Sequence, residues 1–220
     1  MTRAKIGRML ALIPIVIFSG IIGAAVATSS ATIETQRTRI SLILWAAFFI
    51  IWSIAGRNSA PSQRSESWGS TYIHQTALIA ALMLLFVQAP GLTGFFLPES
   101  FRPAVVIGVI VQCAFLLFAF WARWHLGRNW AAEVRIGEGH ELVRTGPYRW
   151  VRHPIYTAML GMFVGTAIAS GQYHALLGVV ILFVAYIRKT RLEEEILSRT
   201  FPTDYEAYRR STWRLVPPVF

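Results

Sequence analysis

Long apolar segments alternate with short polar ones along most of the chain, and the apolar segments lack the polar face of a helix in a soluble protein. A helix needs about 20 apolar residues to cross the hydrocarbon layer of a bilayer, within a range of about 17–25. Most of the segments approach that length when their flanking residues are included. The pattern predicts an all-α, polytopic integral membrane bundle with about six spans. These are Met9–Ala27, Ile40–Ala55, Tyr72–Pro90, Pro103–Trp121, Ile155–Ser170 and Tyr173–Ile187.

The basic residues indicate which way such a bundle is oriented. Lys and Arg gather on the cytoplasmic side of membrane proteins. If the N-terminus is cytoplasmic, eighteen of the 21 basic residues fall in cytoplasmic segments. We therefore expect a multi-pass protein of a prokaryotic inner membrane with both termini in the cytoplasm. The segments on that side are 1–8, 56–71, 122–153 and 188–220.

The net charge of +10 suits a cytoplasmic face against anionic lipid. Nucleic acid is not an expected partner, because the basic residues border spans instead of forming a soluble basic domain. The five histidines lack the spacing of metal ligands, so no metal site is predicted. The oligomeric state is not readable from the sequence.

The two halves of the chain differ in character. Residues 1–121 contain few ionisable groups and are interpreted as transmembrane scaffold helices. Residues 122–220 combine two further spans with charged, aromatic and glycine residues, and are interpreted as a catalytic region with a cytosolic cofactor-binding part. Tyr205, Tyr208 and Trp213 alternate with arginines, which predicts a C-terminal interfacial helix.

Several residues define local structure in the second half. Pro154 suits the first turn of a helix, where its missing N–H costs little. Pro202 should end the long helix that leaves the membrane after Ile187. Gly161, Gly165 and Ala169 follow one another at four-residue spacing, which lets another helix approach closely.

Two motifs carry the chemical information. They are HELVRTGPYRWVRHPIY at residues 140–156 and RLEEEILSRTFPTDYEAYRR at residues 191–210. In combination they resemble the isoprenylcysteine carboxyl methyltransferase family and its bacterial and archaeal relatives, which include phospholipid N-methyltransferases. The resemblance covers the C-terminal part of the chain. The scaffold half shares with the family only its apolar character, which many membrane proteins have.

This resemblance implies an integral membrane methyltransferase that uses S-adenosyl-L-methionine and releases S-adenosyl-L-homocysteine. The substrate would be lipid-like or hydrophobic: a prenylcysteine-type carboxylate, a lipid amine or a thiol. Aligning the motifs on Phe201 favours Glu193 as the cofactor-binding acid, and aligning on His153 favours Glu194. Arg191 or Arg188 would contact the substrate. The implied cofactor-binding residues are His140, Leu142, Val143, Tyr148, His153, Pro154, Tyr156, Glu193 and Glu194.

These residue types suit the cofactor chemically. A carboxylate can hold the ribose hydroxyls or the ammonium group through charge-assisted hydrogen bonds. A histidine can donate to the cofactor carboxylate, and tyrosine rings can face the adenine or the sulfonium. Methyl transfer is a direct displacement that depends on alignment, so no catalytic triad is required.

Simpler interpretations compete at each position. His153 could be only a helix cap. Glu193–Glu195 could form a solvated face, with Arg191 and Glu195 paired at helical spacing. Tyr148 and Tyr156 could be interfacial anchors.

Two other functions also compete. An NADPH-dependent membrane reductase of the sterol reductase type would use Arg144, Arg149 and Arg152 for the 2′-phosphate. A small-solute transporter would need ionisable groups inside its spans, and the first four apolar segments have none in their middle.

Overall fold

The computed structural model describes residues 33–55, 63–64, 67–87, 91–92, 94–98, 100–127, 135–136 and 142–218. The first predicted span, Met9–Ala27, lies outside these residues. The described chain is all-α, as predicted, apart from one pair of two-residue strands. Its helices are α2 (Ile33–Ala55), α3 (Trp68–Phe86), α4 (Pro103–Leu126), α5 (Pro154–Ser170), α6 (Tyr173–Thr200) and α7 (Pro202–Ser211).

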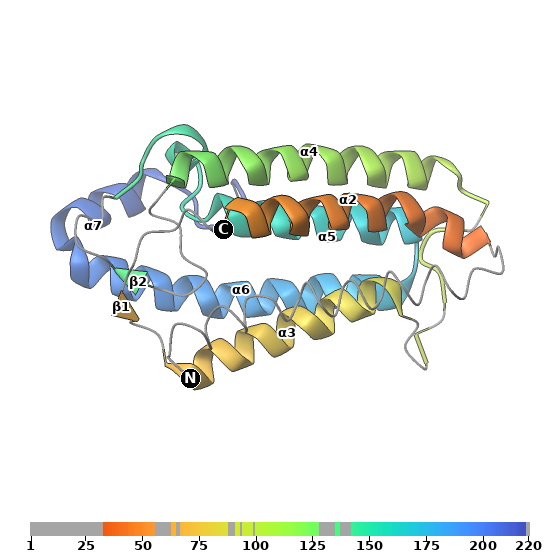
Figure 1. Ribbon diagram of the computed structural model, residues 1–220, viewed down its shortest axis with the longest axis horizontal. Coiled ribbons are helices and arrows are strands. Elements are labelled where there is room, and N and C mark those ends of the chain that lie inside the picture. Colours follow the sequence, from red (N-terminus) through yellow and green to blue (C-terminus); the bar gives the residue numbers. More distant parts are fainter. Residues whose placement is uncertain are drawn as a thin grey trace.

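Helices α2 to α6 run side by side along the long axis of the molecule (Figure 1). The most extensive contacts join α4 to α5 and α3 to α6. Strands β1 (Gln63–Arg64) and β2 (Arg135–Ile136) pair antiparallel. This pair brings the start of α3 and the end of α4 to the same end of the bundle, where α7 also lies.

Two helical segments, Gly69–Phe86 and Pro103–Leu126, are long and apolar enough to cross a membrane. Their outward surfaces are apolar as well: Ile73 of α3 is 57% exposed, and Leu117 of α4 is 68% exposed. A continuous apolar surface of this kind is costly in water and suits contact with lipid. Helices α2 and α5 contribute shorter apolar segments, Arg39–Ile54 and Pro154–Ser170. The count of six spans stays a prediction.

The small residues of α5 allow its close contact with α4. A Cβ atom added to Gly108 of α4 would lie 2.4 Å from the carbonyl oxygen of Gly165 and 2.5 Å from the backbone nitrogen of Ala169. A Cβ atom on Gly161 would meet the ring of Phe115 at 2.1 Å. The close helix approach predicted from the spacing is therefore confirmed, with α4 as the partner.

Polar side chains inside the bundle attach α2 to its neighbours. Trp45 donates from its indole nitrogen to the hydroxyl of Thr166 on α5, at 3.1 Å. Gln112 of α4 donates to the backbone carbonyl of Ser41, at 3.2 Å. Hydrogen bonds in such a low-dielectric interior fix the register of packed helices, because an unpaired polar group there is costly.

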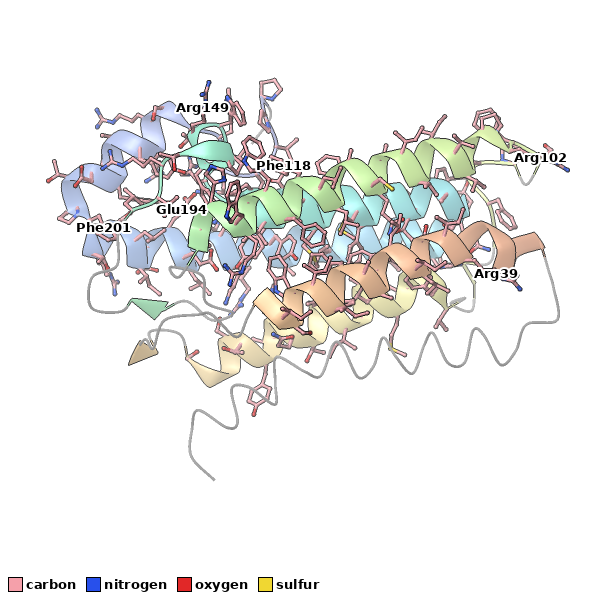
Figure 2. The ribbon with its side chains drawn as sticks, turned by 45° about the horizontal axis from the view of Figure 1, so that its top comes forward. Arg39, Arg102, Phe118, Arg149, Glu194 and Phe201 are labelled. Carbon is pink, nitrogen blue, oxygen red and sulfur yellow. The ribbon has the colours of Figure 1, made fainter. Side chains whose placement is uncertain are left out.

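The ends of the bundle carry different residues (Figure 2). Glu194, Arg149 and Phe201 lie at one end, and Arg39 and Arg102 lie at the other. The sequence predicts the same separation, since it places the first three on the cytoplasmic side and the last two outside. The cytoplasmic assignment itself stays a prediction.

Substitution of Gly108 tests the α4–α5 contact. We expect Gly108→Ala to lower the free energy of unfolding by about 1–3 kcal/mol, because the added methyl group meets backbone atoms that cannot move aside. Gly69→Ala is the matched control, since a Cβ atom there meets nothing within 4 Å. Thermal unfolding in detergent compares the two variants, and equal stabilities would contradict the close contact.

Candidate functional site

The candidate site forms where the start of α5 meets the C-terminal part of α6, beyond the apolar part of that helix. A 3₁₀ turn, η3 (Gly146–Arg149), precedes α5 and directs residues 150–153 back towards the bundle. Pro154 occupies the first turn of α5, as predicted. His153 is the N-cap residue, but its side chain makes no capping hydrogen bond. The capping interpretation of this side chain is therefore wrong.

The imidazole of His153 instead lies between two glutamates of α6. Its Nδ1 is 3.2 Å from Oε2 of Glu193. Its Nε2 is 3.4 Å from Oε1 of Glu194. The ring is 7% exposed, so both approaches occur away from solvent.

Glu193 belongs to an aromatic part of this cluster. The hydroxyl of Tyr156 donates to Oε1 of Glu193 at 2.5 Å. The Tyr156 ring stacks on Tyr186 with a centroid distance of 4.5 Å, and it lies nearly parallel to the His153 ring. The Glu193 carboxylate is thus held by a phenol hydroxyl and an imidazole nitrogen whose rings are stacked on each other.

Glu194 belongs to a charged part of the same cluster. Arg152 donates from Nε to Oε1 at 2.8 Å. Arg214 donates to both carboxylate oxygens, at 3.1 and 2.7 Å. The Glu194 side chain is only 7% exposed, and that of Arg152 is 8% exposed. This is a buried ion triad with a bidentate arginine, which is the stronger form of such a contact.

The segment Thr212–Leu215, here called the C-terminal strap, closes this triad. It follows α7 and runs beside residues 150–153, where Trp213 forms a parallel bridge with Val151. Backbone amides of Arg152 and His153 donate to carbonyls of the strap at 2.8 and 3.2 Å. The strap therefore fixes the backbone of Arg152 and His153, whose side chains belong to the cluster.

Electrostatics of the cluster favour its charged forms. Burial alone would raise the pKa of both glutamates, but the adjacent imidazole of His153, together with Arg214 and Arg152 at Glu194, outweighs this effect. The pKa of each carboxyl is therefore held below its usual range. Burial alone would lower the pKa of His153, yet the two carboxylates raise it above its ordinary value. Each ring nitrogen of His153 faces a carboxylate, an arrangement that favours the protonated imidazole.

Other residues predicted for cofactor binding lie near this cluster in the chain. Tyr148 is buried in η3, and its backbone carbonyl accepts a 2.6 Å hydrogen bond from the hydroxyl of Tyr208. Burial raises the pKa of Tyr148, so its phenol is neutral. Leu142 and Val143 are half-buried in the segment before η3. His140 lies outside the described residues.

The two arginines predicted to contact substrate take different positions on α6. Arg188 donates to the hydroxyl of Ser70 on α3, at 2.9 Å. Arg191 is exposed. A role for either in binding substrate stays a prediction.

Two interpretations of the surface are corrected by the structure. The acidic run is not a solvated face at Glu193 and Glu194; only Glu195 behaves so, and it pairs at 2.6 Å with Arg199, not with Arg191. The predicted C-terminal helix is present as α7 but shorter than expected, since it ends at Ser211, before Trp213, and its tyrosines are buried. Its place at a membrane interface stays a prediction. Tyr205 and Tyr208 are 0% and 5% exposed.

Sequence reasoning assigned no site role to three buried or half-buried cations. Arg152 was expected to set orientation or bind phosphate, and Arg214 to lie on an interfacial helix. Lys189, which is 1% exposed, also helps to lower the pKa of Glu193. In the sequence, only the position of Arg152 beside the His153-Pro154 pair could have indicated that it belongs to the site. No sequence feature indicates this for Arg214, because its contact with Glu194 depends on the reversal of the chain after α7.

Comparison with known proteins finds a family match over the region that contains most of this cluster. Residues 103–204 match the family model described as phospholipid methyltransferase. The resemblance predicted from the sequence is confirmed. The matched region runs from the start of α4 into α7, and it contains the whole cluster except the strap.

Three individual proteins are similar to parts of this chain. A protein-S-isoprenylcysteine O-methyltransferase A of Arabidopsis thaliana is 29% identical over 118 residues, which is 52% of this chain and 56% of that protein. The nickel-cobalt-cadmium resistance protein NccN of Alcaligenes xylosoxydans xylosoxydans is 36% identical over 95 residues, 42% of this chain and 44% of that protein. An uncharacterized Bacillus subtilis protein, YpbQ, is 39% identical over 41 residues, 19% of this chain and 24% of that protein. The chain thus covers less than two thirds of these relatives.

Removal of the Glu194 charge tests the buried triad. We expect Glu194→Gln to lower the free energy of unfolding by about 3–5 kcal/mol, because two arginines lose the anion that balances them away from water. Glu195→Gln is the matched control on the same helix, and its exposed pair should contribute below about 1 kcal/mol. Chemical denaturation of both variants in detergent makes the comparison. Equal losses would show that the triad does not stabilise the fold.

The pH dependence of stability provides a second test. Because the folded-state pKa of Glu194 is lowered, its stabilisation is complete above the unfolded value of about 4.3 and is lost as the pH falls below it. Wild-type protein should therefore lose thermal stability on acidification from about pH 6 to pH 3. Glu194→Gln should lose less over the same interval, since its amide does not titrate. A wild-type stability that stays flat in this range would contradict the lowered pKa.

Proposed function

We propose that this protein is an integral membrane methyltransferase of the EC 2.1.1 type that transfers the methyl group of S-adenosyl-L-methionine to a lipid-like or hydrophobic substrate. One observation carries the proposal. The region that matches phospholipid methyltransferases contains His153, Glu193 and Glu194. Those three residues converge in one buried cluster at the end of an apolar bundle.

The residues of the cluster fit the chemistry of the cofactor. Its amino-acid end, ribose hydroxyls and sulfonium need an anion, hydrogen-bond partners and aromatic faces. Glu193 offers a carboxylate whose side chain is 19% exposed, against 7% for Glu194. Glu194 is already bound by two arginines, so Glu193 is the acid that we assign to the cofactor. Tyr156 beside it supplies an aromatic face for the cation.

The remaining predicted residues complete the proposed site. Both ring nitrogens of His153 already face glutamates, so its proposed role is to orient Glu193 towards the cofactor. Backbone groups of Leu142 and Val143 would form hydrogen bonds with the edge of the adenine. When bound, the cofactor supplies an electrophilic methyl group on sulfur. The protein would contribute chiefly the alignment of that group with the nucleophile. The nucleophile belongs to the substrate.

A hydrophobic substrate suits the surroundings of the cluster. The apolar outer surfaces of α3 and α4 lead along the bundle towards the same end. A substrate carried in a bilayer could therefore reach the cluster without leaving the apolar phase. We propose Arg188 or Arg191, on the segment of α6 just before the glutamates, as its polar contact.

The reductase alternative is less consistent with the arginines. Arg144 is bonded to Asp204 at 2.7 Å. Arg152 is bonded to Glu194 at 2.8 Å. Two of the three cations that would bind a 2′-phosphate are therefore already paired with carboxylates. The transporter alternative has no comparable support, since the acidic cluster lies at one end of the bundle and not within it.

A methyl-transfer assay tests the proposed function directly. Purified protein with methyl-labelled cofactor should label a component of membrane lipid extract, a prenylcysteine analogue or a hydrophobic thiol. The same protein should bind S-adenosylhomocysteine and not NADPH. Binding of NADPH alone would favour the reductase, and binding of neither would contradict both enzymes.

Glu193→Gln tests the choice between the two acids. We expect it to weaken S-adenosylhomocysteine binding by about 1.5–3 kcal/mol, the contribution of a hydrogen bond to a charged group. Glu195→Gln, two residues further along α6 and exposed, should leave the affinity unchanged. Calorimetry on the purified variants measures both. An unchanged affinity in Glu193→Gln would remove this residue from the proposed site.

A further inference from the structure

The C-terminal strap lies beyond the region that matches the methyltransferase family, yet it contributes a charged side chain to the cluster. The match ends at residue 204, and Arg214 stands ten positions further along the chain. Its guanidinium donates to Glu194 through both Nε and Nη2, at 3.1 and 2.7 Å. The side chain is 17% exposed, so this contact is largely shielded from water.

A continuous chain of contacts leads from Arg214 to the proposed cofactor acid. The carboxylate of Glu194 accepts hydrogen bonds from Arg214. Its Oε1 also lies 3.4 Å from Nε2 of His153. The opposite ring nitrogen, Nδ1, approaches Glu193 at 3.2 Å. The orientation of the imidazole thus depends on where Glu194 is held, and the position of Glu193 depends on the imidazole.

The backbone of the strap reinforces the same arrangement. The amide of His153 donates to the carbonyl of Arg214 itself, at 3.2 Å. The hydroxyl of Thr157, one turn into α5, donates to the carbonyl of Leu215 at 2.5 Å. Arg152 also donates from Nη1 to the carbonyl of Thr212. The strap is therefore fixed to the start of α5 by both backbone and side-chain bonds.

We propose that Arg214 is a positioning residue of the cofactor site, which acts by holding Glu194 so that His153 and Glu193 keep the orientation that the cofactor requires. The proposal rests on the proposed function. It assigns a role in cofactor binding to a residue outside the matched family region. Arg214 does not touch the cofactor in this scheme, and its effect passes through the carboxylate of Glu194.

Binding of S-adenosylhomocysteine to purified variants tests the proposal. Arg214→Ala should weaken the affinity about tenfold. Arg214→Lys keeps the charge and loses the planar fork, so its affinity should fall between those of Arg214→Ala and the wild type. Arg210→Ala is the matched control, because Arg210 is 78% exposed and pairs only with Glu206 among the contacts of the described residues. Its affinity should equal that of the wild type.

A double-mutant cycle separates positioning from simple stabilisation. If Arg214 acts through Glu194 and His153 on Glu193, then adding Arg214→Ala to Glu193→Gln should weaken binding little beyond Glu193→Gln alone. A purely structural role predicts a lowered melting temperature with unchanged affinity at temperatures where the variant is folded. If Arg214→Ala fails to fold, Arg214→Lys takes its place in the same cycle.

The outcomes distinguish this proposal from the proposed function. Wild-type affinity in both Arg214 variants, or additive effects in the cycle, would overturn the positioning role and leave the methyltransferase proposal standing. A wild-type protein that does not bind S-adenosylhomocysteine would overturn both.

Discussion

Glu194 accepts hydrogen bonds from Arg152 and Arg214 in a setting where its side chain is only 7% exposed. This one carboxylate joins three parts of the chain: the extension of α6, the turn before α5 and the C-terminal strap. A buried ion is tolerated only when its partners satisfy it, so the three segments must come together for any of them to be stable there. The cluster around His153 depends on this triad.

The helical bundle places the triad at one end of the molecule. The small residues shared by α4 and α5 bring those helices close along their length, which positions the start of α5 beside the end of α4. Helix α6 continues beyond its apolar part without a break, from Tyr173 to Thr200, and brings both glutamates beside the start of α5. An apolar scaffold thus supports a charged site at its end, as the proposed activity on a bilayer-borne substrate requires.

Helix positions were largely predictable because local chemistry determines them. Pro154 and Pro202 begin α5 and α7 in the structure, and the apolar segments after the first correspond to α2 to α6. The choice between Glu193 and Glu194 was not predictable from motif alignment. Adjacent helical residues point about 100° apart, so a shift of one position moves a carboxylate from the aromatic side of the cluster to the arginine side.

The role of Arg214 could not be predicted for a different reason. It depends on α7 ending at Ser211 and on the strap returning to residues 150–153. The alternation of tyrosines and arginines predicts exposed tyrosine rings along one helix, and it gives no sign that Tyr205 and Tyr208 are buried by tertiary packing. Long-range pairing of this kind leaves no periodic signal in the sequence.

The central claim is that the cluster around His153 forms the cofactor site and that the Glu194 triad supports it without contacting the cofactor. An experimental structure of the protein with bound S-adenosylhomocysteine tests it most directly. The account predicts ligand density against Glu193 and Tyr156, with both bonds from Arg214 to Glu194 intact. Ligand density elsewhere in the protein, or Glu194 released from Arg214 to bind the ligand, would contradict it.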